Sequence, residues 1–243
     1  GTLGVRYVLN SKMNMTSQLR HKTVHNNYNT LVNTDAGFAL ARLRNDSNEW
    51  SNKVSYKPVK WFENSFRLQL IDNVFHTQNL DQDGAWTTRT DWLKSQGNQR
   101  IYTYDVVIQP LDQWMFDLAY SLTNFKISTP ASQVAVSSGG IPVFRSDINT
   151  WLFTASYAPK DNLSIFGSYQ YSRAKNFDSH GYAGIPFGID NQRNDFTLGL
   201  KWDVKKDLTI EPHYGYYSYK AYQSIDYGNY SAHIFMIDLN AKW

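Results

Sequence analysis

The chain has 243 residues, with 24 Lys and Arg against 21 Asp and Glu for a formal net charge of +3, and it contains no cysteine. The lack of cysteine excludes a disulfide framework, a thiolate zinc site and a cysteine nucleophile. The small net charge without a basic block argues against a nucleic-acid partner. No apolar run approaches the roughly 18 residues that a membrane-spanning helix needs.

Alternation of apolar and polar residues with a period of two begins at the N-terminus. Residues 3–9 form the first candidate strand. Alternation then fades, and we interpret residues 10–48 as one long loop; strands at 20–32 and 38–43 are the alternative, and would raise the strand number to twelve.

The rest of the chain shows the alternation repeatedly. Its segments exceed the usual strand length of about 5–6 residues in soluble proteins. Several are close to the 9–11 tilted residues that cross a bilayer as a β-strand. The pattern predicts about ten strands. Those after the first lie at about 50–56, 66–70, 102–109, 114–123, 150–157, 163–172, 196–203, 208–216 and 235–243.

Short and long connections alternate along the chain. The short connections lie near 58–64, 111–113, 160–161 and 205–207, and Pro58, Pro110 and Pro159 mark three of them. A hairpin unit therefore recurs, with tight turns on one side and loops on the other, within a single domain that covers residues 1–243. The long connections are about 10–48, 77–98, 128–147, 175–192 and 220–229.

Aromatic residues gather near both ends of the predicted strands on their apolar side. Two rows of Trp and Tyr are typical of the two interfaces of a bilayer. A soluble β-sandwich, propeller or solenoid is the alternative, but its core would have to accommodate these rings with little Val and Leu. The predicted aromatic girdle includes Trp50, Trp114, Trp151, Tyr157, Trp202 and Trp243.

The opposite face of the strands is rich in Ser, Thr, Gln and charges of both signs. In a membrane barrel that face lines the lumen. Since every backbone polar group in hydrocarbon must be paired, an open sheet cannot span a bilayer and a closed barrel can. The sequence thus predicts an all-β, transmembrane, antiparallel up-and-down β-barrel of ten to twelve strands, or a part of a larger one. The predicted lumenal residues are Lys53, Arg67, Asp105, Asp117, Lys201, Asp203, Glu211, His213 and Lys242.

The segment His233-Ile-Phe-Met-Ile-Asp-Leu-Asn-Ala-Lys-Trp243 resembles the terminal strand of bacterial outer-membrane β-barrels. Such strands end in an aromatic residue, more often Phe than Trp. The hairpins at 55–58 and 156–165 resemble the Tyr-x-Pro units of large porins. Among these we consider the longer porin-like sheaths around multihaem cytochromes, of which this chain would be the C-terminal part. The resemblance implies a bacterial outer-membrane location, contact with lipid and lipopolysaccharide, and recognition by the barrel assembly machinery.

Catalytic and metal-binding patterns are weak in this sequence. His21 and His25 lack the glutamate of a zinc motif, and Asp178, Ser179 and His180 are adjacent, whereas a triad is usually assembled from separate segments. We therefore expect no enzyme activity, no cofactor and no metal. The prediction is a passive porin-like channel, or a sheath that encloses a periplasmic or extracellular protein. An outer-membrane hydrolase with a site at the extracellular rim, or a loop-mediated adhesin or receptor, is the alternative.

Overall fold

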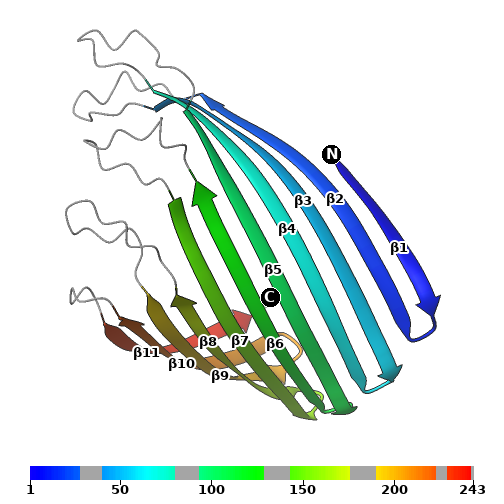
Figure 1. The fold of residues 1–243 in the computed structure, drawn as a ribbon. Coiled ribbons are helices and arrows are strands. Elements are labelled where there is room, and N and C mark those ends of the chain that lie inside the picture. The colour runs from blue at the N-terminus through cyan, green and yellow to red at the C-terminus, as the bar shows by residue number, and fades with distance from the viewer. Residues whose placement is uncertain (28–39, 80–92, 129–142, 176–189, 223–228, 242–243) are drawn as a thin grey trace.

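The fold is a single antiparallel sheet (Figure 1). The computed structural model describes residues 1–27, 40–79, 93–128, 143–175, 190–222 and 229–241. Within these ranges no helix has both the length and the apolar content to cross a bilayer. The strands are β1 (Thr2–Asn10), β2 (Met13–Asn27), β3 (Leu40–Val59), β4 (Phe62–Asn79), β5 (Leu93–Leu111), β6 (Trp114–Ser128), β7 (Val143–Lys160), β8 (Leu163–Lys175), β9 (Asn191–Lys205), β10 (Leu208–Ala221) and β11 (Tyr230–Ala241).

Each strand pairs with its neighbours in sequence, so the topology is up-and-down from β1 to β11. Two-residue turns close five hairpins at one end of the sheet, which we call the turn end. At the other end of the sheet, which we call the loop end, β2, β4, β6, β8 and β10 end and β3, β5, β7, β9 and β11 begin (Figure 1). The all-β up-and-down class is confirmed, and the eleven strands found in the described residues lie within the predicted ten to twelve.

Irregular pairing recurs beside the tight turns. The register shifts between Tyr56 and Val59, between Ile108 and Leu111, and between Tyr157 and Lys160, and each shift spans one of the three turn prolines. Proline cannot donate to the ladder, so it is placed where the ladder is already interrupted.

The residue before each of these prolines donates to the turn of the preceding hairpin. The backbone N–H of Lys57 bonds the carbonyl of Lys12 at 2.7 Å, and Gln109 bonds Trp61 at 2.7 Å. Ala158 bonds Gln113 at 2.8 Å in the same way. The repeated unit therefore links each tight turn to the one before it, which fixes the turn end as a continuous rim.

The predicted loop at 10–48 is wrong. Residues 13–27 form β2, and residues 40–48 belong to β3, so the connection is confined to 28–39. Alternation fades there because β2 is polar on both faces beyond Leu19, apart from Val24, yet the ladder with β3 continues from His21 to Asn27. The other long connections are also shorter than predicted, since β5 begins at Leu93 and β7 at Val143.

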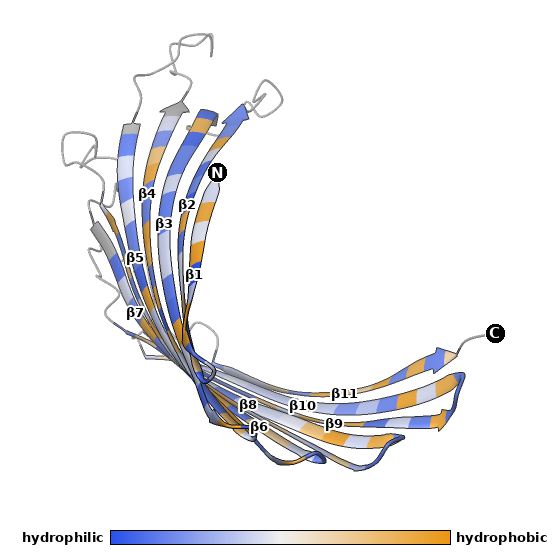
Figure 2. Ribbon diagram, turned by 90° about the vertical axis from the view of Figure 1, so that its right-hand side faces the viewer, coloured by the Kyte–Doolittle hydropathy of each residue, from blue (hydrophilic) through white to orange (hydrophobic). Residues whose placement is uncertain are grey.

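The first and last strands form two separate edges. Figure 2 shows β1 and β11 far apart across the opening of a curved sheet. Because the number of strands is odd, β1 and β11 both run from the loop end to the turn end. A direct pairing of these two edges would be parallel.

Candidate functional site: the inner face of the sheet

The register of the ladders aligns the side chains into two faces across all the strands. One face, here called the outer face, carries rows such as Leu68, Tyr102 and Leu122, in which each residue is paired with the next. The other, the inner face, carries rows such as Lys53, Arg67 and Thr103. Figure 2 shows the resulting alternation of hydrophobic and hydrophilic bands along the strands. The apolar and polar faces predicted from alternation are therefore continuous from strand to strand.

The curvature of the sheet distinguishes these faces by burial. Residues less than one tenth exposed, including Ser55, Ser65, Ala174 and Asp195, lie on the inner face. Large exposed apolar side chains lie mainly on the outer face, for example Phe66 at 46% and Leu118 at 42% exposure. Side chains crowd together on the concave side of a bent sheet and separate on its convex side. The polar inner face is therefore the concave one.

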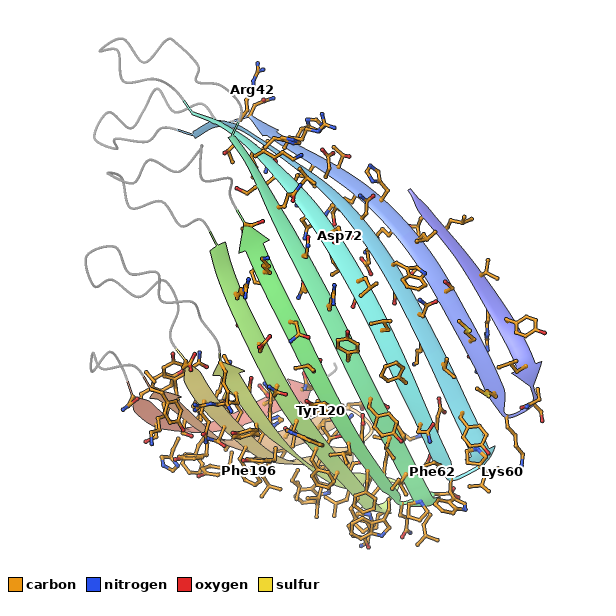
Figure 3. All side chains as sticks on the ribbon, in the orientation of Figure 1. Arg42, Lys60, Phe62, Asp72, Tyr120 and Phe196 are labelled. Atoms are coloured by element: carbon orange, nitrogen blue, oxygen red, sulfur yellow. The ribbon has the colours of Figure 1, made fainter. Side chains whose placement is uncertain are left out.

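The outer face changes abruptly from apolar to polar at a defined level. Toward the loop end, Trp50 is followed on its face by Asn48, and Leu70 by Asp72. In Figure 3, Arg42 marks the loop end and Phe62 lies at the turn end. Asp72 lies between them, closer to the loop end than Phe62 is. The last apolar residues before this boundary are Leu19, Trp50, Leu70, Tyr102, Leu122, Trp151, Tyr171, Phe196, Tyr216 and Phe235.

The boundary descends the sheet in regular steps. Within hairpins closed by a tight turn, the boundary residues face each other, as Trp151 faces Tyr171. From β4 onward, the last apolar residue faces the first polar one across each following connection, as Tyr171 faces Asn194, whereas Leu19 and Trp50 on β2 and β3 face each other without a step. The strands of a barrel are tilted relative to its axis. Residues at one height along that axis are therefore not paired with each other in the ladders, and a boundary at constant height shifts along the strands in steps.

Beyond the boundary, the outer face of β2, β3 and β4 is polar apart from Val74, and its polar groups pair with one another. Thr23 Oγ1 donates to Asp46 Oδ1 at 2.8 Å, and Arg44 Nε lies 2.8 Å from Asp46 Oδ2. His21 Nδ1 lies 2.8 Å from Asn48 Oδ1. The pKa of Asp46 is below its ordinary value, first because of the hydrogen bond from Thr23 and further because of the Arg44 guanidinium. These polar groups satisfy one another.

Four of the predicted lumenal residues lie together on the inner face of β3 to β6. Lys53 faces Arg67 directly across β3 and β4, and neither forms an ion pair within the described residues. Asp105 faces Ser65 on β4, next to Arg67, and Asp117 follows on β6. The Oδ1 atom of Asp117 is buried and has no hydrogen-bond partner among the described residues. The arrangement sets two cations beside two carboxylates.

A second cluster lies on the inner face of β10 and β11 near the turn end. His213 Nε2 lies 3.3 Å from Glu211 Oε1 and 3.4 Å from Asp238 Oδ2. Glu211 and Asp238 face each other across the two strands. The imidazole thus lies between two carboxylates that would otherwise repel each other. In the described part of the chain, no group of three or more His, Asp or Glu side chains is placed to hold a metal ion.

The remaining predicted lumenal residues do not form a common site. Asp203 Oδ1 accepts a hydrogen bond from Thr209 Oγ1 at 2.6 Å, and Lys201 is exposed on the same face. Lys242 lies outside the described residues. Sequence reasoning missed Arg193, whose Nε lies 2.7 Å from Asp195, and Glu49, which accepts from Gln69 at 2.7 Å. The alternation of the sequence places both residues on the inner face, whereas their contacts can be seen only in the folded structure.

The predicted girdle residues lie on the outer face at two levels. Trp50 and Trp151 are at the polar boundary, and Trp114, Tyr157 and Trp202 are near the turn end. Trp114 stacks on Tyr157 with ring centroids 4.1 Å apart. Trp243 lies outside the described residues. Their role as a membrane girdle remains a prediction.

Comparison with known proteins finds likeness in structure alone. No protein-family model matches the chain, and no curated protein matches it. Among solved structures, a Pseudomonas aeruginosa FadL homologue has 10% identity and a TM-score of 0.44; the match covers 92% of this chain and 61% of that one. The CymD monoaromatic hydrocarbon channel has 9% identity and a TM-score of 0.44, over 100% of this chain and 72% of that one.

The porin NanC has 12% identity and a TM-score of 0.38, with 100% of this chain and 98% of that chain covered. The chain spans less than two thirds of the length of the FadL homologue. The resemblance to outer-membrane β-barrels predicted from the sequence is thus found in the arrangement of strands, at low identity.

Proposed function

We propose that the chain forms the wall of a passive, porin-like channel in the bacterial outer membrane. The observation that supports this is the coincidence of three features on one sheet: an apolar convex face, a polar concave face, and a sharp apolar-to-polar boundary on the convex side. A membrane barrel requires this order, because lipid contacts the outside and water the inside. A protein folded around an apolar core would require the reverse.

The charges on the inner face fit a hydrated passage. Like charges that face each other across two strands are destabilising unless water or counterions screen them. Lys53 and Arg67 face each other in this way without a carboxylate partner among the described residues. We infer that small ions and polar solutes pass along this face, or that a partner protein occupies the same space. The proposal assigns no catalytic step and no cofactor to the chain.

Conductance in planar lipid bilayers tests the channel. The purified protein should produce discrete current steps, and its reversal potential in a KCl gradient reports selectivity. Replacing both Lys53 and Arg67 with Glu should raise the permeability ratio of K⁺ over Cl⁻ roughly fivefold, since one charge pair at about 4 Å in water is worth about 1 kcal/mol. The matched control is Lys60→Glu, a change of the same sign in the tight turn between β3 and β4.

Two results would contradict the proposal. If the inserted protein carries no current, the sheet does not line an open passage. If Lys60→Glu shifts the reversal potential as much as the double variant, then Lys53 and Arg67 do not lie along the path of the ions.

A further inference from the structure

Beyond the boundary, the two faces of β4 to β7 exchange their polarity. On the outer face, Leu70 is followed by Asp72, and Leu122 by Asn124. On the inner face, mainly polar residues give way to Ile and Phe toward the loop end. We call six of these inner-face residues the apolar patch: Ile71, Phe75, Ile101, Phe125, Ile127 and Ile148.

The side chains of the apolar patch adjoin one another across neighbouring strands. Gly97 on β5 faces Ile127 on β6. A Cβ atom at Gly97 would lie 3.2 Å from Cε2 of Phe75 and 3.6 Å from Cγ1 of Ile127, so these two side chains converge over the glycine. Phe125 faces Ser146 on β7. Ser146 is 3% exposed, and its hydroxyl has no hydrogen-bond partner in the described part of the chain, so its surroundings there are apolar.

The apolar patch is only partly covered. All six of its side chains are half-buried by the residues that the structure describes. On the concave face of a channel wall they would contact the water of the passage, and the removal of apolar surface from water is favourable. The patch therefore suits a solute with an apolar part.

Two cations lie nearer the turn end on the same face. Lys53 and Arg67 face each other across β3 and β4, without a carboxylate partner among the described residues. Arg67 and Ile71 are both on the inner face of β4 and are about 13 Å apart along the strand. The chain of octanoate and a flexible Arg or Lys side chain together span that distance. Asp105 and Asp117 lie on the turn-end side of Arg67, so they do not separate the cations from the apolar patch.

A carboxylate also lies beside the apolar patch, but its charge is compensated. Glu49 faces Ile71 across β3 and β4. Its side chain accepts a hydrogen bond from Gln69 at 2.7 Å, and it lies 3.8 Å from the Arg20 guanidinium. The charge that a solute would meet on this part of the face is therefore the positive charge of Lys53 and Arg67.

We propose that the inner face of β3 to β7 binds an amphipathic anion, with its apolar part on the apolar patch and its carboxylate at Lys53 and Arg67. A carboxylate would bind these cations through charge-assisted hydrogen bonds. The inference rests on the proposed function, since it requires the inner face to line a passage. It deepens that function by naming a class of solute and the two parts of its binding site.

Block of the single-channel current by three solutes tests this site in the full chain, inserted into planar lipid bilayers. Octanoate has both an apolar chain and a carboxylate, acetate has the carboxylate alone, and octanol has the chain alone. Octanoate added on the side of the loop end should reduce the current in a saturable manner. Its half-blocking concentration should be at least about tenfold lower than that of acetate or octanol.

Removal of the cations tests the part of the site that binds the carboxylate. The double variant Lys53→Gln with Arg67→Gln should raise the half-blocking concentration of octanoate about fivefold. The matched control, Lys12→Gln with Lys60→Gln, removes two cations from tight turns and should leave that concentration unchanged.

A polar substitution in the apolar patch tests the other part. Ile71→Ser should raise the half-blocking concentration of octanoate about fivefold and leave that of acetate unchanged. The matched control is Val74→Ser, which removes an apolar side chain from the outer face of the same strand. Ile101→Ser, on the neighbouring strand β5, is a second patch variant with the same expected result if Ile71→Ser does not fold.

Four results would overturn the inference. Equal block by octanoate and acetate would mean that the apolar patch makes no contribution, and equal block by octanoate and octanol would mean that the cations make none. An equal loss in Val74→Ser and Ile71→Ser would show that the effect does not arise on the inner face. Patch variants that bind octanoate as the unmodified protein does would mean that other parts of the protein cover the patch.

The current itself distinguishes this inference from the channel proposal. A protein that conducts ions but is not blocked by octanoate would refute the solute site alone. A protein that carries no current would refute the channel, and with it the solute site that rests on it.

Discussion

At the residue scale, the inner face depends on glycines that leave room for aromatic rings. A Cβ atom at Gly199 would lie 2.4 Å from Cζ of Phe166 and 2.9 Å from Nδ1 of His213. At Gly215 it would lie 2.8 Å from Cε2 of Tyr217. Rings that cover a strand glycine restore the packing that the missing side chain would have provided. The Phe166 ring also lies beside the His213 ring, with centroids 5.5 Å apart.

Substitution of Gly199 tests this packing. Gly199→Ala should displace the Phe166 ring and lower the free energy of unfolding by about 1–3 kcal/mol, a typical cost of overpacking. Urea titration in lipid vesicles measures it. The control is Gly4→Ala, whose Cβ would meet nothing closer than the Ser17 carbonyl at 3.6 Å. Adding Phe166→Ala should relieve the strain at Gly199→Ala, so a purely additive loss in the double variant would contradict the contact.

At the element scale, the proposed orientation of the sheet places adjacent residues of β6 against lipid and against water. Leu118 lies on the outer face opposite Phe153 and Val106, and the neighbouring Ala119 lies on the inner face opposite Asp105. Arginine on the lipid face at the bilayer midplane costs about 2–4 kcal/mol, and less near the interfaces. The strand therefore offers a comparison of the same substitution on two faces.

Leu118→Arg should destabilise the protein folded in vesicles, lowering its free energy of unfolding by about 2–4 kcal/mol. Ala119→Arg should cost far less, because its guanidinium would project into the polar side near Asp105 and Asp117. Denaturant titration of both variants in the same vesicles measures the difference. Equal losses for the two variants, or a larger loss for Ala119→Arg, would mean that the two faces are assigned in reverse.

The sequence predicts elements well where their two faces differ in polarity. Residues 196–202 alternate Phe, Leu, Leu and Trp with polar or small residues, and β9 lies there. The same method failed at β2 from His21 onward, because almost all residues there are polar on both faces, and ladder and side-chain hydrogen bonds to β3 hold the strand without an alternating pattern. Strand ends beyond the boundary cannot be predicted from alternation for that reason.

The alternation predicted which residues of the candidate site face inward, but not which of them contact each other. Lys53 and Arg67 are both inward by alternation, yet only the register shows that they face each other. Arg193 and Glu49 were missed, because the contacts that they make with Asp195 and Gln69 are visible only in the folded structure.

At the scale of the whole molecule, the stepped boundary is typical of a closed barrel, whereas the edges of β1 and β11 are unpaired in the described part of the chain. The boundary shifts by two residues between Leu70 and Tyr102, between Leu122 and Trp151, and again at the two later connections. Such steps place the strands at a tilt to the membrane plane, which a closed barrel requires. An unpaired strand edge is unfavourable in hydrocarbon, however, because each unpaired backbone N–H or C=O group costs several kcal/mol there.

The edge of β1 is where closure can be measured. Gly1 and His21 exchange both backbone hydrogen bonds, at 2.7 and 2.9 Å, so by antiparallel alternation the N–H groups of Thr2, Gly4 and Arg6 point to the free edge. In vesicles these amides should be protected from hydrogen exchange nearly as well as those of β4. Their partner strand must run opposite to β1 if the sheet remains antiparallel, which excludes β11 as that partner. The matched comparison is the Leu3 amide on the same strand, which faces β2 and is protected whether the sheet is open or closed. Rapid exchange of Thr2, Gly4 and Arg6 beside a protected Leu3 would show that the edge stays open to water, and a closed hydrocarbon-spanning barrel would then be refuted.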